Sequence, residues 1–512
     1  MAEELKSEKL TVCTKKKIGT VQVKNAVVLN APENDKINKV LSFIAVPVVE
    51  QTDIVGTEVK INGYIRYNAL VCLESGEFLP ISTNSAFNAS IENAIVESDM
   101  VIDVTYNILD SVQSASSDGS EISYTTTINF LVDGILQNNS IDTIALDKNL
   151  FTKESEIDVN NFVNKIIYNS TVNAEVVKDA KTARILYTNF SGIVKAVTTN
   201  EDYFTVSGDI ILTTIVVGED GQIRSNIKEV PYTEEIEAKG IDKNSIIQAR
   251  FVPKEAVIIV NEENGNFSID MPFSIIANIY TTSKKRCVID AYSLNREVNL
   301  TTESFEQNEF FATKFLDDNI IANLTLSEQT ERIEKILSTT PINISVVNYY
   351  TKNGEIIIEG VANFSLTYYS EDDDGNKILN SVLLEVPYSL NVLAPDVIEG
   401  DDVDINLSIG DINIRSKRGR ELDVIASVKI NYSIVRSFIS AMATKISYGE
   451  EKPLKDYALE IYVAKQNQTI WDIAKEMNIS SENLLKQNSE LTLPISPGEK
   501  IIVYHQIEEK FS

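Results

Sequence analysis

The chain has 512 residues and is strongly acidic, with 75 Asp and Glu against 46 Lys and Arg and a formal net charge of −29. This charge opposes contact with phosphate groups, so we expect no nucleic-acid partner and no binding to anionic lipid surfaces. Hydrophobic residues make up 43% of the sequence, which is enough for several domains with cores of their own. The abundance of Tyr, Phe, Val, Ile and Thr favours β-sheet.

The cysteines and the apolar runs indicate a protein that stays in a reducing cytosol. Cys13, Cys72 and Cys287 are far apart, odd in number and form no CxxC pair, so a disulfide framework is not expected. Residues 1–13 lack the apolar centre of a signal peptide. The longest apolar run, residues 43–49, contains a proline and is far too short to span a bilayer, so we expect no membrane span.

A unit of strand, tight turn and strand occurs three times along the chain. It begins at Gly63, Gly208 and Gly360, and the copies therefore start 145 and 152 residues apart. Each unit turns at a second glycine and ends in a strand with an aromatic residue; these pairs are Gly76 and Phe87, Gly221 and Tyr232, and Gly375 and Tyr388. A period of this length indicates repeated domains and not a solenoid.

The flanks of the three units also agree. Before each unit lies a related segment (36–41, 182–186, 332–337), and after it come two long alternating segments (100–109 with 122–132, 246–260 with 267–280, 403–414 with 421–433). The pattern predicts a mainly β protein built from three tandem β-sandwich or barrel-like repeat domains, over 1–150, 151–300 and 301–440. Polar joints are expected at 147–155 and 294–308, and a linker at 441–458.

The segment 459–505 has a different pattern, in the order strand, helix, helix, strand. Thr469 with Asp472 three residues later resembles a capping box, although the acid is shorter than the usual Glu. Four apolar residues follow at helical spacing: Ile470, Ile473, Ala474 and Met477. Residues 494–498 contain two prolines and a glycine that separate the second helix from the strand 500–504.

This segment resembles a LysM module. The likeness is carried by Tyr462-Val463, by residues 469–475 (TIWDIAK), by Leu484-Leu485-x-x-Asn488 and by Ile495-x-Pro497-Gly498-x-Lys500. The resemblance implies a small βααβ domain, and most members of the family bind N-acetylglucosamine polymers in a groove between two loops. The usual Gly-Asp before the Thr is Asn467-Gln468 here, and the usual Asn-Pro is Asn488-Ser489, so the loops that line the groove are altered.

Three such β-domains followed by a LysM module resemble the SipL-like spore coat morphogenetic proteins, in which the β-domain is called SPOCS. The family resemblance implies a protein of the mother-cell cytoplasm at the forespore surface and of the spore coat. It implies binding to the coat ATPase SpoIVA through the LysM module, with other coat proteins and self-association as further candidates. Binding to peptidoglycan stays open as the alternative.

Catalytic and metal-binding patterns are lacking in the sequence. The single histidine is His505, beyond the last expected strand, and no GxSxG occurs. The acidic stretch 371–375 has a glycine at the wrong position for a calcium loop, so we interpret it as a hairpin turn. We therefore expect no enzyme activity, no cofactor and no metal.

Trp471 is the leading candidate for contact with a partner, because it lies about 100° from the apolar stripe of its helix, with Lys475 one turn later. The equally weighted alternative is that Trp471 packs against the linker or a terminal strand. The candidate partner-binding residues are Trp471, Lys475, Asp472, Asn467, Gln468 and Asn488.

Overall fold

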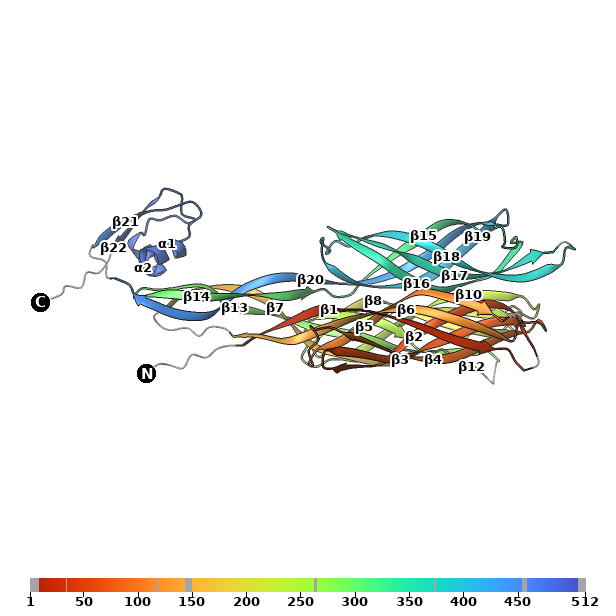
Figure 1. The fold of residues 1–512 in the computed structure, drawn as a ribbon. Coiled ribbons are helices and arrows are strands. Elements are labelled where there is room, and N and C mark those ends of the chain that lie inside the picture. Colours follow the sequence, from red (N-terminus) through yellow and green to blue (C-terminus); the bar gives the residue numbers. More distant parts are fainter. Residues whose placement is uncertain are drawn as a thin grey trace.

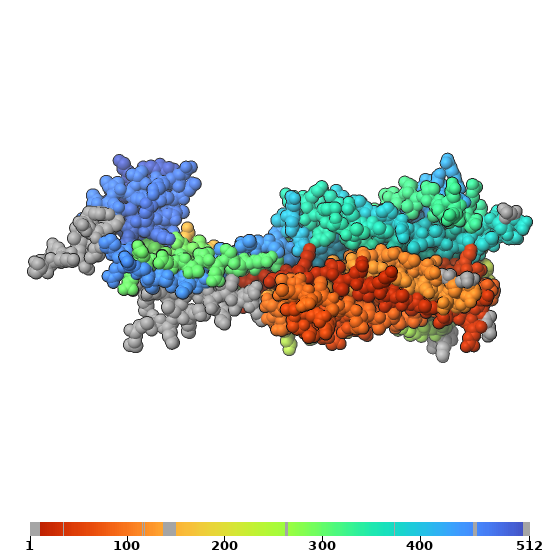
Figure 2. Space-filling model, viewed as in Figure 1, coloured from red at the N-terminus to blue at the C-terminus, as the bar shows by residue number. Residues whose placement is uncertain are grey.

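The computed structural model describes residues 9–33, 35–116, 118–142, 150–261, 265–372, 374–453 and 458–504. It is an elongated molecule in which three β-domains form one body, and long strands lead from that body to a small module at one end (Figure 1). The space-filling view shows the three domains closely packed and the module at the end of the long strands (Figure 2). The predominantly β fold that the sequence predicted is confirmed.

Each repeat, here called a copy, consists of two antiparallel sheets. One is the hairpin sheet of three consecutive strands: β2-β3-β4, β10-β9-β8 and β16-β17-β18. The other is formed by the strands that precede and follow the hairpin sheet, in the order β1-β6-β5 in copy one. In copy two, β7, β11 and β12 all pair with β13, and in copy three β14, β15 and β19 all pair with β20.

The strand bounds are as follows. Copy one holds β1 (Lys9–Asn30), β2 (Ile37–Val55), β3 (Glu58–Leu73), β4 (Phe78–Glu92), β5 (Val101–Ala115) and β6 (Glu121–Asp142). Copy two holds β7 (Leu150–Val176), β8 (Arg184–Thr199), β9 (Tyr203–Val217), β10 (Ile223–Glu237), β11 (Ile246–Pro253), β12 (Val257–Val260) and β13 (Phe267–Ser293). Copy three holds β14 (Arg296–Phe310), β15 (Lys314–Thr325), β16 (Lys335–Lys352), β17 (Glu355–Glu371), β18 (Lys377–Leu393), β19 (Asp402–Lys417) and β20 (Glu421–Glu451).

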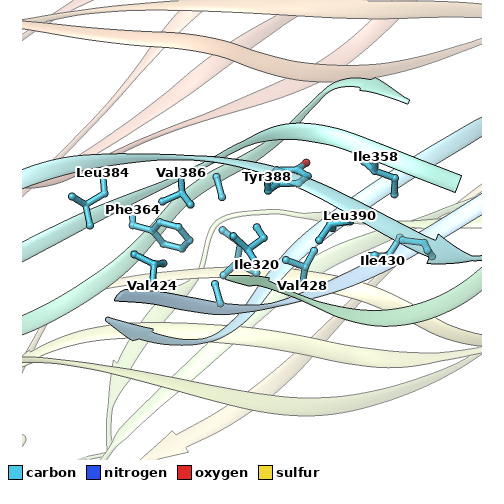
Figure 3. Close-up of a cluster of buried hydrophobic side chains, with 14 of the residues drawn as sticks. Ile320, Ile358, Phe364, Leu384, Val386, Tyr388, Leu390, Val424, Val428 and Ile430 are labelled. Carbon is cyan, nitrogen blue, oxygen red and sulfur yellow. The ribbon is translucent and has the colours of Figure 1, made fainter. Parts of the chain in front are cut away.

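The two sheets of each copy enclose its hydrophobic core. In copy three, Phe364 and Val386 of the hairpin sheet lie over Val424 and Val428 of β20 (Figure 3). Val386 and Val424 alternate with exposed or half-buried residues along their strands, as in a sheet with one buried face. The alternation read from the sequence therefore corresponds to the faces of a β-sandwich.

The repeated glycine marks a close contact in every copy. In copy three, Gly360 lies opposite Val346 beside a β-bulge and opposite Tyr388 on the other side. The Tyr388 side chain lies across the glycine, and its hydroxyl donates to the carbonyl oxygen of Ser345 at 3.0 Å. Gly208 with Tyr232 has the same arrangement in copy two. A side chain at this position would overlap the neighbouring carbonyl oxygen, and this overlap explains the repeated glycine.

Equivalent segments of the three copies meet at the centre of the body. They line a cavity of about 280 Å³ and include 44–46 of β2, 189–192 of β8 and 341–344 of β16. The spacing of these segments equals that of the repeated glycines, so the copies are arranged around a common axis like the subunits of a threefold assembly.

Buried ion pairs join the copies beside this axis. Asp103 of copy one accepts hydrogen bonds from Lys165 and Arg250 of copy two, each at 2.7 Å. Burial opposes ionisation of this carboxyl, but the two cations outweigh it and hold the pKa of Asp103 well below its usual range. Lys15 contacts Asp133 of its own copy at 3.0 Å and Asp404 of copy three at 2.6 Å. The copies are therefore held in one relative orientation.

The expected joints and linker were wrong in part. Residues 150–155 begin β7, residues 296–308 belong to β14, and residues 441–451 complete β20; residues 454–457 lie outside the described part of the chain. Copy three therefore begins before residue 301, because β14 pairs with β20 along its length. These strands extend past the body as a stalk, where few side chains are covered, so their polar composition resembled that of a linker. No helix among the described residues is long and apolar enough to cross a membrane.

Candidate functional site

The module at the end of the stalk has the predicted order of strand, helix, helix and strand. It consists of β21 (Leu459–Val463), α1 (Ile470–Met477), α2 (Ser481–Gln487) and β22 (Lys500–Tyr504), with β21 antiparallel to β22. Its core consists of buried residues from both helices and from β22: Ile473, Ala474, Met477, Leu484, Ile501 and Val503. The helices therefore cover one face of a two-stranded sheet.

The predicted capping box at the start of α1 is present. The Thr469 backbone N–H donates to Asp472 Oδ2 at 2.8 Å, and the Thr469 hydroxyl accepts from the Asp472 backbone N–H at 3.3 Å. The carboxylate of Asp472 thereby caps the N-terminus of α1. These hydrogen bonds, mainly from Thr469, hold the pKa of Asp472 below its usual value.

Trp471 and Lys475 both contact the end of β13. The Trp471 indole Nε1 donates to Asp290 Oδ2 at 2.8 Å, and Lys475 Nζ lies 2.5 Å from Asp290 Oδ1. The Trp471 ring also packs edge-on against Tyr292, with ring centroids 4.9 Å apart. Trp471 thus packs against β13 of copy two, whereas the alternative interpretation had named the linker or a terminal strand.

Further contacts complete this interface, which we call the dock. Tyr292 is 2% exposed, belongs to the apolar cluster of the module and donates to the carbonyl oxygen of Ile479 at 2.8 Å. Asn478 donates to the carbonyl oxygen of Leu294 at 2.6 Å. Lys452 donates to the carbonyl oxygen of Ser293 and to Asn478 Oδ1, at 2.8 Å each. The dock therefore fixes the helical face of the module on the stalk.

The electrostatics of the dock favour an ionised Asp290. Partial burial of Asp290 opposes ionisation, but the hydrogen bonds from Lys475 and Trp471 outweigh it and hold the pKa of the carboxyl below its ordinary value. The carboxylate thus accepts from one cation and one indole N–H, a pair of charge-assisted hydrogen bonds.

The loop before α1 is organised around Gln468. Gln468 Nε2 donates to the Tyr462 hydroxyl at 2.8 Å, and Gln468 Oε1 accepts from the Lys465 backbone N–H at 2.8 Å. The Tyr462 hydroxyl donates to Glu476 at 2.6 Å. Asn467 is exposed and has a left-handed backbone with φ of 62°, a conformation that Asn tolerates well. Gln468 therefore braces the loop, whereas Asn467 is open to solvent.

Asn488 stabilises the outer edge of β22. Its side-chain amide accepts from the Ile502 N–H at 2.8 Å and donates to the Ile502 carbonyl oxygen at 2.7 Å. Gln487 makes the same pair of bonds with Tyr504. Two consecutive amide side chains thus take the place of a neighbouring strand. The sequence suggested a groove position for Asn488, and the structure gives it a role in the fold.

The face of the module sheet opposite the helices is apolar and exposed. Five large side chains lie on it, each 38–59% exposed: Leu459, Ile461, Val463, Ile502 and Tyr504. The pairing of Leu459 with Tyr504 and of Ile461 with Ile502 places them on one surface. We call this surface the outer face. Contiguous apolar surface of this kind is typical of protein-binding sites.

Four side chains of the dock were not singled out by the sequence: Asp290, Tyr292, Lys452 and Asn478. The expected strand ended at Tyr280, whereas β13 continues to Ser293. The apolar residues Val288, Ala291 and Tyr292 were a weak signal that the strand continues. Their partner, α1, lies 181 residues away from Asp290 at Trp471, so local pattern could not connect them.

The described residues contain no group of three or more His, Cys, Asp and Glu side chains placed to hold a metal ion. The acidic tip of copy three is a hairpin turn in which the Gly375 N–H donates to the Asp372 carbonyl oxygen at 3.0 Å, as the Gly221 N–H does to Gly218 in copy two. The three cysteines are buried and unpaired. His505 lies outside the described residues.

Comparison with protein families agrees with these modules. The family model described as SipL, SPOCS domain, matches residues 332–417, which lie in copy three, and the LysM domain model matches residues 462–503. No curated protein and no solved structure matched the chain. Both matched families are non-catalytic domains. Copies one and two share the strand order, the bulge and the glycine of the matched copy. The chain therefore contains a SipL-type SPOCS domain followed by a LysM domain, as the resemblance indicated.

Proposed function

We propose that the protein is a non-enzymatic spore coat assembly protein that acts at the forespore surface in the mother-cell cytoplasm. Its LysM domain binds the coat ATPase SpoIVA, and its β-domains help to encase the forespore. The proposal is supported by the order of modules, a SipL-type SPOCS domain followed by LysM. The same two matches support a LysM protein related to sporulation.

The outer face is the surface that we assign to SpoIVA. The opposite face of the LysM domain is occupied, because α1 contacts Asp290 and Tyr292 in the dock. Among the described residues no element covers the outer face, where Ile461 is 59% exposed. Burying one isoleucine side chain contributes about 1.5–3 kcal/mol, so this surface can supply specific binding energy.

The experiment measures SpoIVA binding by the full chain with Ile461→Glu and, separately, Ile502→Glu. Each should weaken binding by at least about tenfold, because an acid replaces a buried apolar contact. Ile439→Glu on β20, a site 77% exposed and away from the LysM domain, is the matched control and should bind normally. Trp471 fluorescence checks that the module remains folded and docked. Undiminished binding by both outer-face variants would contradict the assignment.

Binding to peptidoglycan or another N-acetylglucosamine polymer is the second candidate, because the LysM match itself suggests a glycan ligand. The altered loop argues for lower affinity, since Gln468 is turned inward to Tyr462. Titration of chitin oligomers against the full chain distinguishes the two candidates. Saturable binding that is abolished by Asn467→Ala and unchanged by Ile461→Glu would favour the glycan.

A further inference from the structure

Strand β12 is an exposed edge in copy two. It lies in the half of the body away from the LysM domain (Figure 1), and within the described part of the chain it pairs with β13 alone. Its four residues, Val257, Ile258, Ile259 and Val260, are all apolar and 39–57% exposed. Successive side chains of a strand point to opposite faces, so β12 is apolar on both faces as well as open along its edge.

In the other two copies the same edge carries polar residues. In each copy the equivalent segment begins two residues after an acidic residue that lies in or directly after a break or bulge of the strand: Asp110, Glu255 and Asp411. These segments read Val-Gln-Ser-Ala at 112–115 and Asn-Ile-Arg-Ser at 413–416. Gln113, Ser114 and Arg415 are exposed there. Polar and charged residues on a free edge prevent pairing with another chain, and copy two lacks them.

We infer that β12 is a self-association site, at which β12 of a second copy of this chain adds as an antiparallel strand. The sequence Val-Ile-Ile-Val reads the same in both directions. A twofold axis between Ile258 and Ile259 places Ile258 opposite Ile259 of the second copy and Val257 opposite Val260, so this sequence pairs Ile with Ile and Val with Val. Such an interface is self-complementary, as twofold symmetry requires, and pairs of β-branched residues stabilise antiparallel strands.

The size and charge of the contact set its strength. A four-residue strand buries less than the roughly 800 Å² per partner of a standard interface, so the dimer dissociates on dilution. Each chain carries a net charge of −29, which opposes association, whereas β12 itself is uncharged. Salt screens the repulsion and strengthens burial of apolar surface, so dimerisation increases with ionic strength. The inference does not depend on the proposed function.

Sedimentation equilibrium of the full chain over a range of concentrations tests the site. The unmodified chain should show a monomer–dimer equilibrium, and Ile258→Gln with Ile259→Arg should weaken it at least about tenfold. These replacements are the residues of copies one and three at the same positions. The control, Ile321→Arg with Val347→Gln, changes apolar residues that are 75% and 69% exposed in copy three, and it should dimerise normally. A monomer at every concentration, or equal dimerisation of the two variants, overturns the inference.

Crosslinking tests the register of the two strands. A mixture of the Ile258→Cys and Ile259→Cys chains should form a mixed disulfide faster than either chain alone, because these positions lie opposite each other across the twofold axis. The native cysteines are buried and do not compete. Equal crosslinking of the mixture and the separate chains would refute the antiparallel register. Each variant counts as folded if the midpoint of its thermal unfolding equals that of the unmodified chain.

Discussion

Replacing Asp290 with Ala should weaken the docking of the LysM domain on the stalk. Asp290 is the single carboxylate that both Trp471 and Lys475 contact in the dock, at 2.8 and 2.5 Å. The substitution removes the two hydrogen bonds and leaves the indole N–H without its acceptor. The contacts of Tyr292 and Asn478 with the module remain, so the docked state is weakened and not abolished.

The size of the effect follows from the two bonds. A hydrogen bond to a charged group contributes about 1.5–3 kcal/mol when it is partly buried, as the Trp471 bond is. The Lys475 pair is more exposed, with 44% of the lysine side chain accessible, and contributes about 0.2–1 kcal/mol. The docking equilibrium should therefore shift by about 2–4 kcal/mol, or roughly 30- to 700-fold towards the undocked state.

Trp471 is the only tryptophan of the chain, so its fluorescence reports the dock directly. In Asp290→Ala, the emission should move to longer wavelength, and quenching by acrylamide should increase, because the indole becomes exposed. Asp290→Asn keeps an acceptor for the indole and should have an intermediate effect. Asp270→Ala, on the same strand and far from the module, is the control. If Asp290→Ala leaves both the emission and the quenching unchanged, the dock does not hold the module.

The remaining predictions concern acid, the repeated glycine and the edge of β22. Because the docked pKa of Asp290 lies below the ordinary value of about 3.9, docking is fully stabilised above that pH and weakens as the pH falls through the lower pKa; Trp471 quenching should rise there, and Asp290→Asn should lack that step. Gly360→Ala should destabilise the protein by about 2–4 kcal/mol, because the new methyl group overlaps the Ser345 carbonyl oxygen and lies 2.5 Å from the Tyr388 hydroxyl. Tyr388→Phe, which removes the hydroxyl alone, should lower the free energy of unfolding by about 1 kcal/mol. If thermal unfolding shows the same loss of stability for Gly360→Ala and Tyr388→Phe, the steric explanation is refuted. Asn488→Ala should speed amide hydrogen exchange at Ile502 about tenfold, because the amide loses its acceptor, whereas Ser489→Ala should not. Unchanged exchange at Ile502 would show that the edge of β22 is stable without Asn488.

The six candidate residues show how far sequence reasoning reached. Asp472 was identified as the partner of Thr469 in a capping box, and it is. The contact role for Trp471 and Lys475 was anticipated, but the structure contains a contact with Asp290 of the same chain. Asn488 was assigned to a groove because its place in the motif suggested it, whereas its hydrogen bonds to Ile502 make it part of the sheet edge. Binding of a partner by any of the six stays a prediction.

The sequence by itself determined the repeating units, because alternation of apolar residues, glycines at fixed offsets and turn residues are local properties that each copy carries in full. It also determined the LysM domain, whose caps and apolar spacing lie within one short segment. The tertiary structure alone decided that the copies surround a common axis and that β7, β13, β14 and β20 extend into a stalk. It likewise decided that Asp290 holds Trp471. These features depend on pairings between residues more than a hundred positions apart, such as Asp103 with Arg250, and no local pattern specifies which distant partner a strand or a charge will meet.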